Sequence, residues 1–216
     1  MKLRNFWEEM MMMYDDKMKE LGKHFDTHKA AITVTTERFL GIDWRRADGS
    51  GDYYVSYLLD RKRGALYISG DLGDCIAVWY NPLSEKDLKG YVRDIGYFIG
   101  KIQCASDLYC YDEDDVLEEL HEHFDDETVE NYVSSLPDFD IADSEEFWEI
   151  IGSEVADSMW TDGFRPTERL RGILEDIEPD FFEWIDSCGR SISPRVLLWA
   201  VGFRMACEYL EQRCIL

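Results

Sequence analysis

The sequence predicts an α+β protein in which a β-meander with a covering helix is followed by a helical half. Short runs of β-branched and aromatic residues alternate with Gly- and Asp-rich turns between residues 31 and 80. Apolar residues recur at helical spacing before residue 22 and beyond residue 84. Strands followed by helices are typical of the α+β class. The length of 216 residues suits one large domain or two small ones.

The first predicted element is an amphipathic helix over residues 3–22. Met10, Tyr14 and Met18 are spaced for one helix face, and Gly22 is placed where the helix would end. The run of methionines near the start of the chain is therefore interpreted as a packing surface.

A sheet of four or five strands is predicted next. Turn-forming residues occupy positions 47–51, 60–64 and 70–74, and such short connections favour an antiparallel meander over parallel βαβ units. The β-like runs are Ala31–Thr35, Phe39–Trp44, Tyr53–Leu59, Ala65–Ser69 and Cys75–Tyr80.

Helices are predicted for the remainder of the chain. Ser84 and Asp87 form a plausible capping box for a helix that continues to Ile102 and covers one face of the sheet. The later helices are expected at Glu113–Ser134, Ser144–Trp160, Thr167–Ile177, Pro179–Ser187 and Pro194–Gln212. This organisation predicts an α/β-meander subdomain over residues 1–106 and an acidic helical subdomain over residues 107–216, which could also form one continuous domain.

The net charge of −23 is concentrated in one segment of the chain. Residues 102–164 contain 21 aspartates and glutamates and neither lysine nor arginine. Residues 1–101 hold 16 acidic and 16 basic side chains, and residues 165–216 hold 9 and 7. A segment of one sign produces a local negative field that favours a positively charged partner.

The predicted helix over residues 113–134 has an apolar stripe, with carboxylates over the rest of its surface. Like-charged pairs four residues apart would destabilise it by roughly 1–2.5 kcal/mol in total. It would be about 33 Å long, and its carboxylates would recur about every 3.3 Å, close to the roughly 3.4 Å phosphate spacing of one DNA strand. The predicted partner-binding residues, including three from the next acidic stretch, are Asp114, Asp115, Glu118, Glu119, Glu122, Asp125, Asp126, Glu130, Glu145, Glu146 and Glu149.

In its charge layout the acidic segment resembles small acidic proteins of phages and mobile elements that inhibit restriction or CRISPR nucleases, often by imitating DNA. The resemblance implies an inhibitor that occupies the positively charged groove of a nucleic-acid-binding enzyme such as a defence nuclease. It also implies the cytoplasm of the host if the chain is phage-encoded. Immunity proteins against nuclease toxins have a similar charge for the same physical reason.

Several alternatives remain open. The acidic face could simply keep the protein soluble, and Asp138, Asp140, Asp143 and Glu149 could form a calcium loop, although Ala142 replaces one ligand. Carboxylates that converge only in the fold could build a metal-dependent enzyme. An adaptor or homodimer could form if the basic hairpin Arg61-Lys62-Arg63, with Arg45 and Arg46, met the acidic segment of a second copy.

No motif in the sequence points to catalysis, so a non-enzymatic protein is favoured and no catalytic residue, cofactor or metal is predicted. His121 and His123 lie on different helix faces, and His24 and His28 lack the glutamate of a zinc-protease motif. The six cysteines show no CxxC spacing, so reduced thiols are expected. The apolar stretch Val196–Phe203 is too short to span a bilayer. A cytoplasmic protein without membrane contact or direct nucleic-acid binding is therefore predicted.

Overall fold

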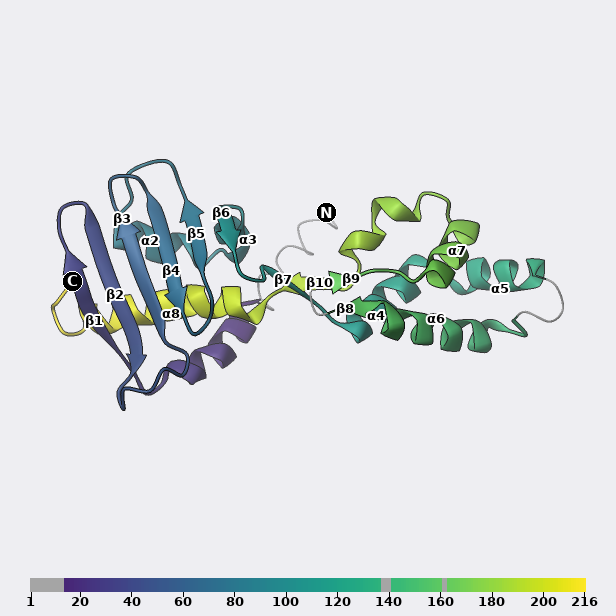
Figure 1. The fold of residues 1–216 in the computed structure, drawn as a ribbon, viewed down its shortest axis with the longest axis horizontal. Helices are drawn as coiled ribbons and strands as arrows, with labels where there is room; N and C mark the ends of the chain where they lie inside the picture. Colours follow the sequence, from purple (N-terminus) through teal and green to yellow (C-terminus); the bar gives the residue numbers. More distant parts are fainter. Residues whose placement is uncertain (1–13, 137–140, 161–162) are drawn as a thin grey trace. The chain divides into compact units, whose positions relative to one another are not determined.

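The computed structural model describes residues 14–136, 141–160 and 163–216. The chain divides into two compact units, of which unit 1 comprises Met1–Leu108 and Ser193–Leu216 and unit 2 comprises Tyr109–Ile192. The α+β class predicted from the sequence is confirmed (Figure 1).

Unit 1 is built on a six-stranded sheet whose strand order follows the sequence. Every neighbouring pair is antiparallel, as the turn chemistry predicts. The strands are β1 (His28–Thr35), β2 (Phe39–Arg46), β3 (Val55–Asp60), β4 (Ala65–Gly70), β5 (Cys75–Val78) and β6 (Ile102–Ala105).

The sixth strand corrects the sequence prediction, which placed Ile102 at the end of one long helix. That region instead contains two short helices, α2 (Glu85–Tyr91) and α3 (Ile95–Ile99). The Ser84–Asp87 capping box begins α2 as predicted, but Asp94 accepts a hydrogen bond from Tyr97 N and starts a second helix. The chain then returns to the sheet beside β5.

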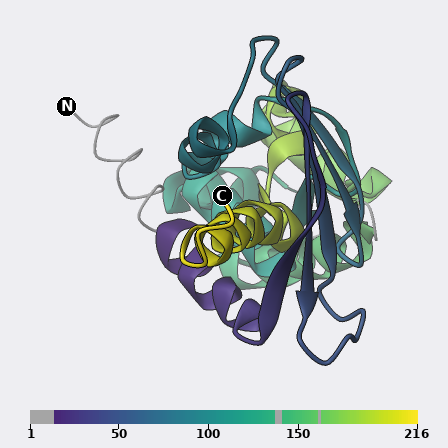
Figure 2. The same cartoon turned by 90° about the vertical axis from the view of Figure 1, so that its left-hand side faces the viewer.

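The helices of unit 1 lie on one face of the sheet, as Figure 2 shows for α2, α3, the helical residues 14–22 and α8 (Pro194–Glu211). Tyr57 Oη donates to the carbonyl of Trp199 at 3.0 Å, which joins the centre of the sheet to α8. A Cβ atom at Gly202 would lie only 2.6 Å from that hydroxyl, so glycine permits the close approach. The part of the predicted N-terminal helix before residue 14 lies outside the described residues.

Helix α8 belongs to unit 1, whereas the sequence analysis assigned it to the acidic subdomain. Its buried residues lie all around the helix, and a helix that is apolar on every side must be enclosed by other elements. It contacts β1, β2, β3, α2 and α3. In the part of the chain that the structure describes, no helix has the length and apolar character needed to cross a bilayer.

Unit 2 is mainly helical, but it is not wholly helical as the sequence predicted. Its α-helices are α4 (Glu113–His123), α5 (Asp126–Ser135), α6 (Ser144–Ser158) and α7 (Glu168–Ile177). The helix predicted over residues 179–187 is replaced by two 3-10 turns, η2 (Phe181–Glu183) and η3 (Ile185–Ser187). Two short antiparallel ribbons complete the unit, β7 (Tyr109–Tyr111) with β10 (Arg190–Ile192) and β8 (Met159–Trp160) with β9 (Gly163–Phe164).

Candidate functional site

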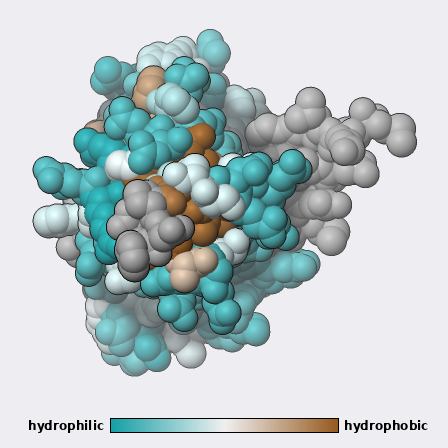
Figure 3. Space-filling model, turned by 90° about the vertical axis from the view of Figure 1, so that its right-hand side faces the viewer, coloured by the Kyte–Doolittle hydropathy of each residue, from teal (hydrophilic) through white to brown (hydrophobic). Residues whose placement is uncertain are grey.

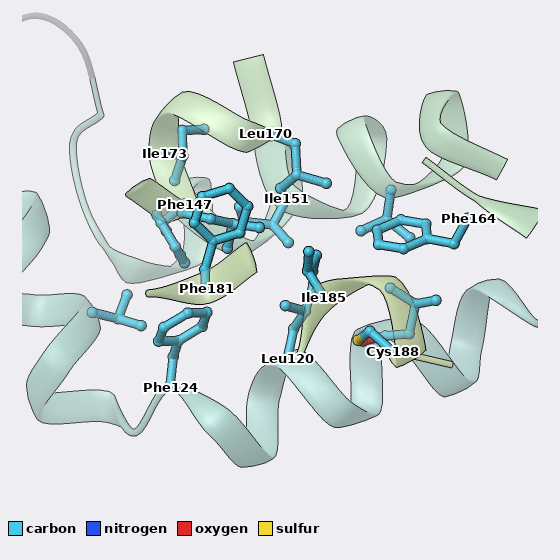
Figure 4. Packing of buried hydrophobic residues seen from close by; sticks show 14 residues of the cluster. Leu120, Phe124, Phe147, Ile151, Phe164, Leu170, Ile173, Phe181, Ile185 and Cys188 are labelled. Carbon is cyan, nitrogen blue, oxygen red and sulfur yellow. The ribbon is translucent and has the colours of Figure 1, made fainter. Parts of the chain in front are cut away.

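The predicted partner-binding residues all lie in unit 2, on helices held by a hydrophobic core of that unit. Leu120 of α4 and the adjacent Phe124 face Phe181 and Ile185 across this core in Figure 4. Phe147 of α6 is only 1% exposed. Burial of this many large apolar side chains gives the acidic helices a rigid support of their own.

The net charge of the protein arises entirely from this unit. Within residues 109–192 there are 27 acidic and 4 basic side chains, whereas unit 1 has 19 of each. Unit 2 therefore carries the whole net charge of −23 on its own. Because unit 1 is neutral, the negative field originates in one folded module.

Helix α4 presents one apolar stripe to the core and carboxylates to solvent. Val116 and Leu120 are fully buried, whereas Glu118, Glu119 and Glu122 are exposed. The start of the helix is capped by Asp112, which accepts a hydrogen bond from Asp114 N at 3.0 Å. Acidic residues in this first turn are stabilised by the helix dipole, but Glu118 and Glu122 lie beyond it.

A close approach of the chain fixes the start of α4. A Cβ atom at Gly189 would lie 2.9 Å from Val116 N and 3.0 Å from Asp112 O, and Gly189 has a φ of +64°. Only glycine fits this position without strain. Cys188 donates to Val116 O at 3.6 Å from the neighbouring position. The segment before β10 is thus held against the first turns of α4.

The prediction of a single helix over residues 113–134 is wrong, because the helical conformation is interrupted between α4 and α5. Phe124 adopts an extended conformation and is 5% exposed, and Asp125 caps α5 by accepting a hydrogen bond from Thr128 N at 2.9 Å. Hydrogen bonds from the Thr128 side chain and backbone also hold the pKa of Asp125 below its usual range. The expected row of carboxylates about 33 Å long is therefore replaced by two shorter helices.

Helix α6 brings the second acidic stretch beside the first, because it packs against both α4 and α5. The His121 ring of α4 stacks on Trp148 of α6, with ring centroids 3.6 Å apart. Glu118 lies one turn before His121, and Glu145 lies one turn before Trp148. Carboxylates of the two helices thus flank a common aromatic contact.

All eleven predicted partner-binding carboxylates are exposed. In the described ranges, none of them forms an ion pair with lysine, arginine or histidine. Asp125 caps a helix, and Glu146 Oε2 accepts a hydrogen bond from Ala142 N at 2.7 Å, so these two also have backbone partners. Glu119 lies beside the Cys188 thiol and, after burial, helps to raise its pKa, so eight of the eleven are available to an external cation.

Some residues of the second acidic stretch are not available in this way. Glu154 is drawn into the α6–α7 contact, where it accepts hydrogen bonds from Thr167 Oγ1 at 2.5 Å and from Arg169 Nη1 at 3.3 Å. Its side chain is 13% exposed, so its role is structural. Asp138, Asp140 and Asp162 lie outside the described residues.

One large aromatic residue beside the acidic helices is exposed. Trp160 follows α6 and is 59% exposed, and the guanidinium carbon of Arg165 lies 5.6 Å from its ring centroid. The other described tryptophans, Trp44, Trp79, Trp148, Trp184 and Trp199, are buried or half-buried. Trp160 departs from that pattern, and large exposed aromatic rings are the residues that most often anchor protein interfaces.

The histidines and cysteines have packing roles in this structure. His24 stacks on Tyr53, and burial lowers the pKa of His28. Burial raises the pKa of Cys75 to about 12, as expected for an inert thiol. His123 Nε2 lies 2.5 Å from Glu178 Oε2. Outside residues 1–13, 137–140 and 161–162, no three histidine, cysteine or acidic side chains are placed to hold a metal ion.

Three of the five cations in and near the basic hairpin of unit 1 have acidic neighbours. Arg61 pairs with Glu85 at 3.1 Å, and Lys62 pairs with Glu37 at 2.9 Å. Arg46 likewise lies within ion-pair distance of two aspartates. These three cations have carboxylate partners within unit 1, whereas Arg45 and Arg63 are exposed and have none among the described residues, so part of the positive charge stays open to a second copy.

Replacing Glu118 with lysine is expected to stabilise unit 2, because Asp114 and Glu122 lie four residues away on the same helix. Two repulsive pairs would become attractive, a gain of about 1 kcal/mol at low salt. Urea unfolding followed by circular dichroism would measure it. The gain should shrink near 1 M NaCl, where the Debye length is about 3 Å. An unchanged gain at high salt would contradict an electrostatic origin.

Comparison of the chain with protein-family models, with curated proteins and with solved structures finds no match. The charge distribution and the surface of unit 2 are therefore the features from which a function can be inferred.

Proposed function

We propose that unit 2 is a binding module that occupies the positively charged groove of a nucleic-acid-binding enzyme and so inhibits it. The observation that carries this proposal is that unit 2 holds the whole net charge of −23 while its exposed carboxylates have no cationic partners among the described residues. Solubility alone would not need the charge to be confined to one unit.

Unpaired surface carboxylates favour a basic partner for two reasons. Their summed field attracts a positively charged surface before contact and can raise association rates 10-fold or more. On contact, each carboxylate can accept charge-assisted hydrogen bonds from lysine or arginine without first giving up a partner within its own chain. The repulsion within α4 is relieved at the same time.

The helical break changes the shape of the proposed binding surface. Helix α4 is about 16 Å long and α5 about 15 Å, and α6 packs against both. The carboxylates are therefore distributed over a compact patch of three helices instead of one straight row. Such a patch can contact several cationic side chains that line a groove. It does not need to reproduce the regular phosphate spacing of a DNA strand.

Apolar groups near the acids would hold the complex once it forms. Figure 3 shows an apolar area surrounded by hydrophilic residues on the face that α5 and α7 reach. Val133, Ile141 and Ile177 are half-buried apolar residues packed against the core of unit 2, and Trp160 offers an exposed ring on the same unit. Interfaces usually combine a few such apolar anchors with a charged rim.

The kind of enzyme we propose is a bacterial defence nuclease of the restriction or CRISPR type, since such enzymes must bind DNA or RNA through basic grooves. A chain with a net charge of −23 would itself be repelled from nucleic acid. The proposed partner is therefore the enzyme and not its substrate.

The proposal is tested by capture from a bacterial lysate that contains candidate defence nucleases. The tagged full-length protein is immobilised at low salt and eluted first with excess double-stranded DNA and then with a salt gradient. We expect a basic nucleic-acid enzyme to be released by DNA, and its activity to fall when the protein is added. The proposal would be contradicted if only acidic or neutral proteins were released, or if excess DNA did not displace the captured proteins.

A further inference from the structure

A pocket in unit 1 has a chemistry that the proposed function of unit 2 does not use. It has a volume of about 430 Å³ and lies between the helical residues 14–22, the segment from α2 to α3, and α8. This volume is within the range of about 300–1,000 Å³ typical of small-molecule sites. Its described lining residues are Asp15, Met18, Lys19, Gly90, Arg93, Asp94, Val201 and Arg204.

Two arginines lining this pocket lack partners among the described residues. In the described part of the chain, neither Arg93 nor Arg204 forms a side-chain hydrogen bond or an ion pair. Arg204 Nε is moreover buried without a hydrogen-bond partner. A buried, unpaired donor of a charged group is unfavourable, and its presence in a native fold calls for an explanation such as a bound ion.

Three other arginines of unit 1 have carboxylate partners, whereas the exposed Arg45 and Arg63 have none among the described residues. Arg38 pairs with Asp60 at 2.7 Å, Arg61 pairs with Glu85 at 3.1 Å, and Arg195 pairs with Asp107 at 2.5 Å. Carboxylates are also close to Arg93 and Arg204, because Asp15 and Asp94 line the same pocket. Asp94 instead caps α3 by accepting a hydrogen bond from Tyr97 N at 2.9 Å. The two guanidinium groups therefore do not form ion pairs with the aspartates that line the pocket.

We propose that this pocket binds a small molecule through one phosphate or carboxylate group held by Arg93 and Arg204. A guanidinium group presents its N–H donors in a planar fork that matches two oxygens of such an anion. The apolar side chains of Met18 and Val201 provide a surface for the carbon part of the ligand. Unit 1 has no net charge, so it does not itself repel an anion.

The carboxylates of the pocket restrict the charge of the ligand. Three cations, Lys19 included, line it together with Asp15 and Asp94, and Lys19 also pairs with Asp16 at 2.7 Å. The surplus of positive charge is small, so a single phosphate or carboxylate fits this wall better than a polyphosphate or a nucleic acid. This site is therefore distinct in chemistry from the acidic surface of unit 2.

Isothermal titration calorimetry of the full chain tests the proposal. Inorganic phosphate and acetate are titrated in separate experiments, with the ionic strength held constant by NaCl. We expect saturable binding of at least one of them with a Kd of about 1–10 mM, as is usual for such small anions. Binding of phosphate alone would assign a phosphate-bearing ligand, and binding of acetate would assign a carboxylate. Absence of saturation by either anion up to about 50 mM, well above that range, would overturn the proposal.

Variants separate this pocket from general electrostatic attraction. Arg93→Gln with Arg204→Gln should weaken binding at least 10-fold, whereas the matched pair Arg45→Gln with Arg63→Gln should change it less than 2-fold. Both control arginines are exposed and lie in unit 1. If the double variant is less well folded, the single change Arg93→Gln at an exposed position should still weaken binding about 3-fold or more, since one of two charge-assisted contacts is lost. Equal weakening in the control pair would overturn the assignment.

Discussion

Replacing Glu118, Glu122 and Glu130 together with glutamine is expected to weaken binding of the captured basic enzyme about 100-fold. All three carboxylates are exposed and lie beyond the first turn of their helices, so the fold should not depend on their charge. Three contacts worth about 1 kcal/mol each would total about 3 kcal/mol, which corresponds to roughly two decades in Kd. Surface plasmon resonance at several salt concentrations would measure the loss of affinity. The Kd of the variant should also depend less steeply on salt concentration than the Kd of the natural protein.

The matched control removes the same number of charges from unit 1. Glu20→Gln, Asp26→Asn and Asp74→Asn also change the net charge from −23 to about −20, the three carboxylates being exposed. This variant should bind within about 3-fold of the natural protein, because only long-range attraction is reduced. If both triple variants lost affinity equally, the acidic helices would not be the contact surface.

Replacing Phe147 with alanine is expected to destabilise unit 2 by about 3–5 kcal/mol and leave unit 1 folded. Phe147 is 1% exposed and packs edge-on against Tyr132 and Trp148, with ring centroids 5.9 Å and 5.1 Å away. Each unit has its own core, so their unfolding can be observed separately. Urea titration should therefore show one early transition, of unit 2, and one unchanged transition, of unit 1. Binding of the basic enzyme should be lost with the early transition.

Phe182 provides the control for this experiment, because it lies in the same unit but is 61% exposed. Phe182→Ala should change stability by less than about 0.5 kcal/mol. A single transition that shifts as a whole in the Phe147→Ala variant would mean that the two units unfold together.

The meander could be predicted because its signals are local. Each hairpin carries its own turn residues, and each strand is rich in branched or aromatic residues. β6 escaped prediction because it is a short edge strand whose Ile102 continues the helical spacing of the preceding residues. The break after α4 was not predicted for a related reason. In the sequence, Asp125 fits equally well as a further acidic residue within a long helix and as the N-cap of a new helix.

The packing of α8 against the sheet of unit 1 could not be predicted from the order of the elements along the chain. Its contact with Tyr57 joins residues 142 positions apart, and sequence patterns carry no information on such pairs. The apolar stretch Val196–Phe203 within it is buried throughout in the structure. What was lacking was the location of the sheet that encloses it.

Of the candidate site, the charge and its exposure could be predicted, because an amphipathic pattern assigns carboxylates to the outer face of a helix. The stack of His121 on Trp148 and the burial of Glu154 depend on how helices pack against one another. Likewise, Arg93 and Arg204 are 111 positions apart and line the same pocket only because of the fold of unit 1.

The two ends of unit 2 leave it side by side, because Tyr109 pairs with Ile192 across the β7–β10 ribbon. The flanking residues are joined as well, since Ser193 N donates to Leu108 O at 3.1 Å. An inserted module with adjacent ends can be lengthened, shortened or exchanged during evolution without altering the path of its host. The acidic unit can thus change its length and surface while the neutral sheet and helices of unit 1 stay the same.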